Sequence, residues 1–256
     1  MIYSVSRRTD MPAFHPDAIV DRVRRSRKLE GLVLWTKDIR NCVRHDGLRR
    51  VMQNIPVIIQ YTVTGLAGGG WEPGVPPFEA QRDALAETAA LLPRGAVRWR
   101  FDPILPSPDL RERFVRVRGG LESVLGPIGQ VTVSFPDPYR HAVRRAEAAG
   151  LAWPGVDSGE KKRIIRMLAA EFAGGAEERP LRLCCEPELL ALPGVGMAHC
   201  IDGALFAGLY GLPLAGLAKD PGQRLACGCC KSTDIGSYGL ACGHGCRYCY
   251  ANTANA

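Results

Sequence analysis

The stretch Val97-Arg98-Trp99-Arg100-Phe101-Asp102 contains the pattern that decides the fold. Its first five residues are rich in valine and aromatic side chains, and a run of this length is typical of a buried strand. Arg100 and Asp102 close the run two positions apart, so in an extended chain both side chains lie on one face. The segment therefore predicts a buried strand that ends in two charged side chains.

Similar runs recur along the chain and alternate with amphipathic segments. The other predicted strands are Ile2–Ser6, Gly31–Thr36, Pro56–Val63, Gln130–Phe135 and Leu181–Cys185. The clearest predicted helices are Asp17–Leu29, Glu79–Leu92, Leu110–Val124, Tyr139–Ala149 and Glu160–Phe172. Strands separated by helices of this length indicate right-handed crossovers and a parallel sheet, either closed into a barrel or open and doubly wound.

Polar residues at the strand ends favour the barrel. Every predicted strand consists mainly of apolar residues and ends in polar side chains. Solvent exposure alone would explain a polar residue at the end of any single strand, but the pattern occurs in all of them. In a (β/α) barrel the carboxyl ends of all strands meet at one mouth, where active sites are built. We therefore expect an α/β protein, a (β/α) barrel of about six parallel strands. The polar strand ends are Arg7, Arg8 and Asp10; Lys37 and Asp38; Gln60, Tyr61, Thr62 and Thr64; Arg100 and Asp102; Ser134 and Asp137; and Cys185 and Glu186.

Length and composition fit one large domain. The chain has 256 residues, of which 46% are apolar and 23% charged, enough to bury a full core. We expect a single barrel domain over residues 1–256, with residues 225–256 a cysteine-rich metal-binding segment packed on the mouth. No apolar run near Met1 is long enough for a signal peptide or a membrane span. We therefore expect a cytoplasmic protein without a membrane partner.

Neither the net charge nor the glycine-rich segment identifies a ligand or partner. A formal charge of +7 suits anionic partners, but the basic cluster from Arg22 to Lys28 fits the solvated face of a helix better than a nucleic-acid patch. The segment Gly65–Gly74 has neither the dinucleotide-binding spacing nor a Lys-Ser/Thr ending. We interpret this segment as a mobile loop at the mouth. The substrate could belong to either of two classes, nucleic acids or small molecules.

Cysteines indicate metal chemistry. In a reducing compartment the ten cysteines favour metal ligation over disulfides. Cys242, Cys246 and Cys249 stand within eight residues on a glycine-containing loop, so three thiolates can wrap around one soft centre. Three cysteines would hold three irons of a 4Fe–4S cluster and leave the fourth open, whereas zinc or an electron carrier would use four ligands. His244 inside this loop is expected to be exposed.

The spacing Cys-x3-Cys-x2-Cys, with Tyr248 before the third cysteine, resembles the cluster loop of radical S-adenosylmethionine enzymes, which also use a partial or full barrel. The chain as a whole resembles the family called domain of unknown function 1848. The matching stretches are Ser6–Ala13, Trp35–Lys37, Gln60–Thr62, Trp99–Pro103, Cys200–Asp202, Cys227–Cys229, Asp234–Gly236 and Cys249–Asn252.

The resemblance implies a specific chemistry. The open iron would bind S-adenosylmethionine, and an electron delivered by a reductant protein such as ferredoxin or flavodoxin would cleave it to methionine and a 5′-deoxyadenosyl radical that abstracts hydrogen from an unknown substrate. The candidate catalytic residues are Arg100, Asp102 and Lys37, and the candidate cofactor-binding residues are Tyr248, Arg7, Arg8, Asp10 and Gln60.

One departure concerns the order of the chain. In radical enzymes the cluster loop follows the first strand, whereas here it follows residue 240. The strand order would need to be circularly permuted, with a strand at Asp234–Leu240 in the first place and Ile2–Ser6 as its successor.

Four further cysteines predict a second centre. Cys185, Cys200, Cys227 and Cys229 supply the number of thiolates that closes a second 4Fe–4S cluster or a zinc site. The alternatives are a small buried Cys200 and a Cys-Gly-Cys redox pair. For the whole protein, the alternatives to a radical enzyme are a non-catalytic iron–sulfur electron carrier or redox sensor, and a zinc-stapled nucleic-acid-binding protein.

Overall fold

A single sheet of eight parallel strands forms the centre of the protein in the computed structural model, which describes residues 1–251. The strands lie in the order β7-β6-β5-β4-β3-β2-β1-β8, so chain neighbours are sheet neighbours except for β8, which lies beside β1. Their bounds are β1 (Ile2–Val5), β2 (Gly31–Thr36), β3 (Val57–Thr62), β4 (Val97–Phe101), β5 (Val131–Val133), β6 (Leu181–Leu183), β7 (Val195–Met197) and β8 (Thr233–Asp234).

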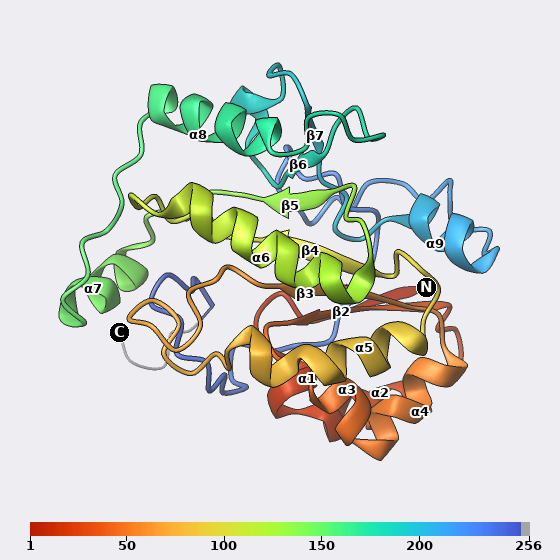
Figure 1. The fold of residues 1–256 in the computed structure, drawn as a ribbon. Helices are drawn as coiled ribbons and strands as arrows, with labels where there is room; N and C mark the ends of the chain where they lie inside the picture. The colour runs from red at the N-terminus through yellow and green to blue at the C-terminus, as the bar shows by residue number, and fades with distance from the viewer. Residues whose placement is uncertain (252–256) are drawn as a thin grey trace.

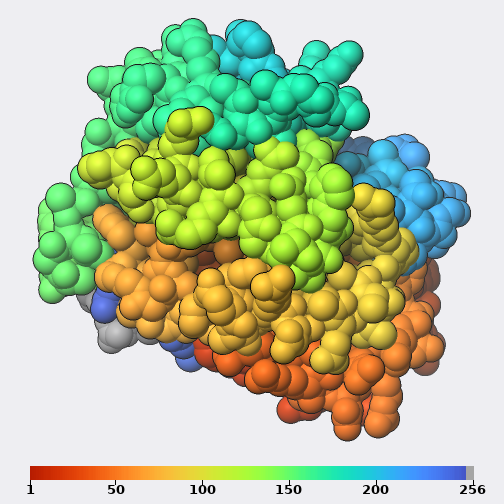
Figure 2. All heavy atoms as spheres, viewed as in Figure 1, coloured from red at the N-terminus to blue at the C-terminus, as the bar shows by residue number. Residues whose placement is uncertain are grey.

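Helices cover one face of this sheet, as Figures 1 and 2 show. Side chains from helices α1 to α6 and α8 pack in one core with alternate strand residues such as Leu32 and Leu34. Their bounds are α1 (Met11–Phe14), α2 (Pro16–Arg24), α3 (Asn41–Arg44), α4 (Asp46–Asn54), α5 (Arg82–Ala90), α6 (Leu110–Leu125) and α8 (Ser158–Ala170). The other helices of residues 1–251 are α7 (Arg140–Ala148), α9 (Gly203–Tyr210) and two 3-10 helices, η1 (Phe78–Gln81) and η2 (Pro187–Leu189). None of these helices is long and apolar enough to cross a membrane.

The segment that follows β7 packs on the opposite face. Ile2, Val33 and Ile58, which alternate with the helix-facing residues, form a second core with Ile201 and Phe206. In Figure 1 the blue end of the chain accordingly passes behind the sheet. Because side chains alternate along a strand, polar residues such as Gln60 and Arg100 belong to this second face. The sheet therefore has an apolar face under helices and a mixed face under its own C-terminal segment.

The α/β class and the parallel sheet are confirmed, with differences in detail. The sheet has eight strands instead of about six, and within residues 1–251 no backbone pairing joins β7 to β8, so the sheet is open and not a closed barrel. The two additional strands have three and two residues, too short for periodicity to reveal. β8 begins where the permuted arrangement requires a strand, but the chain turns away after Asp234.

Candidate functional site

Parallel pairing brings the predicted strand-end residues to one edge of the sheet. Arg7 and Asp10 follow β1, Lys37 follows β2, and Asp102 follows β4. Residues 242–249, which we call the cysteine loop, follow β8 toward the same edge. The described part of the predicted C-terminal segment, residues 225–251, includes this loop, whereas residues 252–256, including Asn252, lie outside the described residues.

His244 fastens the cysteine loop to β1 and β2. Its Nε2 lies 2.7 Å from Asp10 Oδ2, and its Nδ1 lies 3.2 Å from the carbonyl oxygen of Gly74. The same Asp10 carboxylate accepts from the Thr36 hydroxyl at 3.0 Å and from the Lys37 backbone N–H at 2.7 Å. His244 is only 2% exposed, so the expectation of an exposed histidine is wrong. The carboxylate of Asp10, a predicted cofactor-binding residue, thus accepts hydrogen bonds from groups of the protein itself.

Glu72 anchors the other side of the loop. It accepts from Lys37 Nζ at 2.8 Å and from the Tyr248 hydroxyl, and its side chain is buried. Burial by itself would raise the pKa of Glu72, but the adjacent Lys37 ammonium and these hydrogen bonds lower it. The segment Gly65–Gly74 is packed against the cysteine loop: the Gly74 N–H donates to the His244 carbonyl at 2.9 Å, and the Arg247 N–H donates to the Trp71 carbonyl at 2.9 Å.

The three thiols of the cysteine loop share one environment. Burial raises the pKa of the Cys242 and Cys246 thiols, and proximity to Cys249 raises both further. For Cys246, Lys37 acts in the opposite direction. Arg145 Nη1 donates to the carbonyl oxygens of Cys246 and Cys249 at 3.2 and 3.1 Å. A nearby cation would therefore favour the thiolate forms of Cys242 and Cys246.

Asp234 attaches β8 to β1 and so positions the cysteine loop. Its carboxylate accepts from the hydroxyls of Ser4 and Ser6 at 3.2 and 3.0 Å and from the Arg7 N–H at 3.2 Å. Arg8 Nη1 donates to the Gly236 carbonyl at 3.2 Å. Arg8 is therefore engaged with the chain around β8, on the approach to the loop.

Arg100 connects the sheet to a second group of thiols. Its side chain is 4% exposed, and its Nη1 donates to Cys200 Sγ at 2.9 Å while its Nη2 donates to Asp102. The Ser134 hydroxyl also donates to Asp102, and the Arg100 guanidinium lies 4.8 Å from the ring centroid of Trp35. Arg100 and Asp102 thus form a partly buried ion pair on the mixed face of the sheet.

Gln60 and Arg7 lie next to this pair. Gln60 Nε2 donates to the Cys200 carbonyl at 2.7 Å, and Gln60 Oε1 is buried without a hydrogen-bond partner among the described residues. The Arg7 guanidinium lies 5.6 Å from the Trp35 ring centroid and interacts with the Cys229 thiol. Arg7 and Arg100 therefore both lie near the Trp35 ring, and both interact with thiols of the second group.

The second predicted group of cysteines is also brought together. Cys200, Cys227 and Cys229 are buried in one core, with Cys185 packed against it. Cys184, which matched no pattern in the sequence, joins them. As the side chains are placed, no three histidine, cysteine, aspartate or glutamate residues within residues 1–251 have the geometry of a single metal-ion site.

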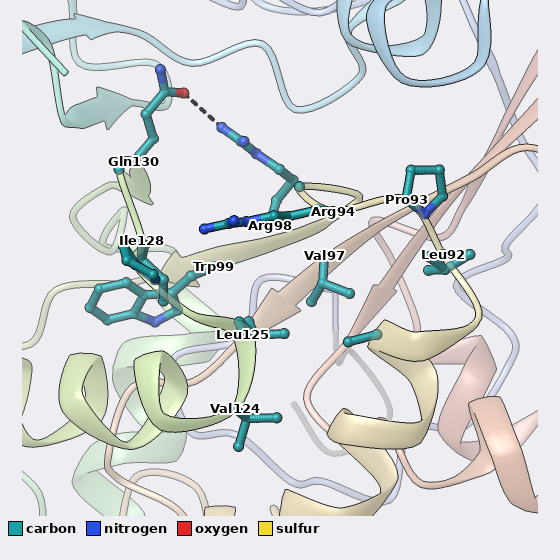
Figure 3. A pocket seen from close by; sticks show the side chains of 14 residues that line it. Leu92, Pro93, Arg94, Val97, Arg98, Trp99, Val124, Leu125, Ile128 and Gln130 are labelled. Atoms are coloured by element: carbon teal, nitrogen blue, oxygen red, sulfur yellow. Dashed lines mark hydrogen bonds between the residues drawn. The ribbon is translucent and has the colours of Figure 1, made fainter. Parts of the chain in front are cut away.

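The pocket of Figure 3 lies at the opposite end of the strands. It has a volume of about 290 Å³ and is lined by residues at the amino ends of β4 and β5, including Arg98 and Gln130, which are joined by a 2.6 Å hydrogen bond. Neither the cysteine loop nor any predicted site residue lines it. We therefore place the candidate site at the carboxyl edge.

Glu72, Trp35 and Asp234 are site residues that the sequence reasoning missed. Glu72 is the one charged residue of Gly65–Gly74, which could have marked it. Asp234 and Trp35 fell within the stretches of family resemblance but were given no role.

The comparisons with known proteins give one match. A family model described as "Domain of unknown function (DUF1848)" matches residues 20–251. No curated protein and no solved structure matches the chain.

Proposed function

We propose that this chain, which belongs to the DUF1848 family, binds a 4Fe–4S cluster through Cys242, Cys246 and Cys249 and acts as a radical S-adenosylmethionine-type enzyme. The substrate is unknown, and a reductant protein such as ferredoxin or flavodoxin would supply the electron.

The observation that best supports the proposal is the position of β8. It pairs in parallel with β1, with Tyr3 beside Thr233 and Ser4 beside Asp234, although the two strands are more than 200 residues apart in the chain. The spatial order therefore begins β8-β1-β2, and the cysteine loop follows the strand at that end. This is the arrangement expected of a circularly permuted, barrel-like sheet with its cluster loop after the first strand.

The residues around the cysteine loop fit a cationic iron–sulfur cluster. Three thiols can each bind a different iron, and the sequence offers no fourth cysteine within the loop. Burial disfavours the ionised forms of Cys242 and Cys246, so the positive charge of iron would be what stabilises these two thiolates. The backbone of the loop is fixed on two sides by His244 and Tyr248, which keeps the sulfurs in place before iron binds.

The chain's own residues would position and shield the cofactor. When bound, the cluster supplies the electron that cleaves the sulfonium of S-adenosylmethionine. Tyr248 and Trp71, whose rings lie 6.5 Å apart, would exclude water beside the cluster. Lys37 lies near Cys246 and would hold a carboxylate of the cofactor, and Arg7, Arg100 and Asp102 would hold the substrate or the cofactor's charged groups.

The test is release of 5′-deoxyadenosine from S-adenosylmethionine by anaerobic, reduced protein, measured by chromatography. We expect roughly four irons and four sulfides at this centre and cofactor cleavage, with both abolished in Cys246→Ala. Cys42→Ser is the matched control, because Cys42 is a buried thiol in the helix-side core. A fully loaded protein that releases no 5′-deoxyadenosine under several reductants would refute the radical enzyme and leave an electron carrier or redox sensor.

A further inference from the structure

Five thiols gather where the sheet is open. Cys184 and Cys185 follow β6, Cys200 follows β7, and Cys227 and Cys229 lie just before β8. All five belong to the core on the mixed face of the sheet, where Cys200, Cys227 and Cys229 are buried. They therefore come from both sides of the opening between the two edge strands, β7 and β8.

Backbone contacts hold the two sides together. The Cys230 N–H donates to the Ile201 carbonyl at 3.0 Å, and His199 Nδ1 lies 2.6 Å from the Gly228 carbonyl oxygen. The Ile201 N–H donates to Cys229 Sγ at 3.4 Å. A side chain at Gly228 would lie 2.7 Å from the Ala198 carbonyl oxygen, so the two segments approach as closely as glycine permits. The thiols are thus positioned by the fold itself.

The pKa values of these thiols depend on one another. Side-chain hydrogen bonding shifts the pKa within the pairs Cys184–Cys185, Cys184–Cys200, Cys200–Cys229, Cys229–Cys227 and Cys227–Cys185. The Cys230 thiol interacts with the backbone of Gly203, and burial and the Cys229 thiol raise its pKa. Five thiols in one core exceed what apolar packing requires, and soft thiolates are the ligands of zinc and of iron–sulfur clusters.

Two guanidinium groups complete the site. Arg100 Nη1 lies 2.9 Å from Cys200 Sγ, and Arg7 interacts with Cys229. Four thiolates bear more negative charge than a divalent metal or an oxidised cluster neutralises, so a buried centre of this kind needs adjacent cations. Both arginines are in place for that role.

We propose that four of these five thiols hold a second metal centre, either zinc or an iron–sulfur cluster, which joins the β6–β7 side of the sheet to the β8 side. The centre does not depend on the cluster of the cysteine loop, because the two sets of cysteines share no residue. The metal would join the two sides of the sheet at a place where β7 and β8 do not pair as strands.

The experiment separates the two centres by substitution. Cys242→Ala, Cys246→Ala and Cys249→Ala are combined to remove the ligands of the cysteine loop, and iron, sulfide and zinc are measured per folded chain after anaerobic purification. We expect this variant to keep about one zinc, or about four irons with matching sulfide. Adding Cys200→Ser with Cys229→Ser should reduce that content at least tenfold, whereas adding Cys230→Ser should not change it.

The possible contradictions are distinct. A folded three-alanine variant without metal, or a five-site variant that retains its metal, would overturn the second centre. If the five-site variant does not fold, X-ray absorption of the three-alanine variant decides, with about four sulfur ligands per zinc, or sulfur-only coordination of iron, expected and nitrogen or oxygen ligands refuting the proposal. If the wild type and the three-alanine variant hold equal metal, the cluster of the cysteine loop fails while the second centre stands.

Discussion

At the scale of single residues, two buried polar contacts position the cysteine loop. His244 joins it to Asp10, and Tyr248 joins it to Glu72. Both partners belong to segments distant in the chain, so each contact fixes one side of the loop against a different part of the edge.

Replacing His244 with alanine should loosen the loop. The change removes one hydrogen bond from the buried Asp10 carboxylate, which keeps Thr36 and Lys37 as partners, and a hydrogen bond to a charged group contributes about 1.5–3 kcal/mol. We expect a decrease of that size in the free energy of unfolding, measured with urea, and lower iron retention. His45→Asn is the control, because asparagine can still cap α4 there. Unchanged iron retention in His244→Ala would show that the contact does not position the loop.

Glu72 should make stability depend on pH. Its pKa is lowered in the folded protein, so its contribution is complete above the ordinary glutamate pKa of 4.5 and is lost as the pH falls through the folded value. Glu72→Gln leaves the buried Lys37 ammonium unpaired, at a cost of about 3–5 kcal/mol near neutral pH.

We expect the stability difference between wild type and Glu72→Gln to be constant above pH 4.5 and to shrink as the pH falls below it, in urea unfolding of metal-free protein. Glu79→Gln, at an exposed position, should behave like wild type throughout. A difference that also stays constant below pH 4.5 would exclude Glu72 as the titrating group.

At the scale of elements, β8 depends on a close approach to β1. A side chain at Gly236 would lie 1.8 Å from Ser6 Oγ, so Gly236→Ala should displace the segment after β8. We expect a loss of about 1–3 kcal/mol in urea unfolding and a lower iron content. At Gly239 an added side chain would meet Ser237 Oγ at 3.6 Å, an ordinary contact distance, so Gly239→Ala is the control. Equal behaviour of the two variants would mean that β8 is not held through this contact.

Strand and helix positions could be predicted because local patterns determine them. The runs Gly31–Thr36 and Val97–Phe101 are strands with the predicted bounds, and the helix predicted at Leu110–Val124 ends one residue later. β8 has only two residues and is stabilised by partners such as Ser4, 230 positions away. Local periodicity contains no information on such a pairing.

The same distinction between local patterns and contacts between distant segments applies to the candidate site. The cysteine loop could be predicted because its ligand spacing lies within eight residues. Glu72 and His244 could not be placed, since their partners Tyr248 and Asp10 are 176 and 234 positions away. Cys184 was missed because its neighbours come from three separate segments.

At the scale of the whole molecule, the open sheet ends in two very short strands. β7 has three residues and β8 has two, so few backbone groups are exposed for pairing with another chain. What holds the two edges in place is then the packing of the mixed face and, in our proposal, the second metal centre.

Loss of that centre should weaken the whole protein. Metal binding at a structural site contributes several kcal/mol to folding, and in a chain of this size each kcal/mol changes Tm by about 2–4 °C. We expect Cys200→Ser with Cys229→Ser to lower the Tm of the metal-loaded protein by roughly 10 °C, and Cys230→Ser to lower it much less. Similar Tm values for the two variants, from calorimetry, would contradict a structural role for the centre.

The place of β8 beside β1 also has a consequence for biosynthesis. Strands β1 to β7 pair with their neighbours in the order in which the ribosome delivers them, so most of the sheet can assemble during translation. The partner of β1 on its other side, β8, emerges after strands β1 to β7, and loop closure over more than 200 residues is slow. Iron delivery to the cysteine loop would accordingly be a late maturation event. It would follow assembly of strands β1 to β7, when β1 already pairs with β2 but does not yet pair with β8.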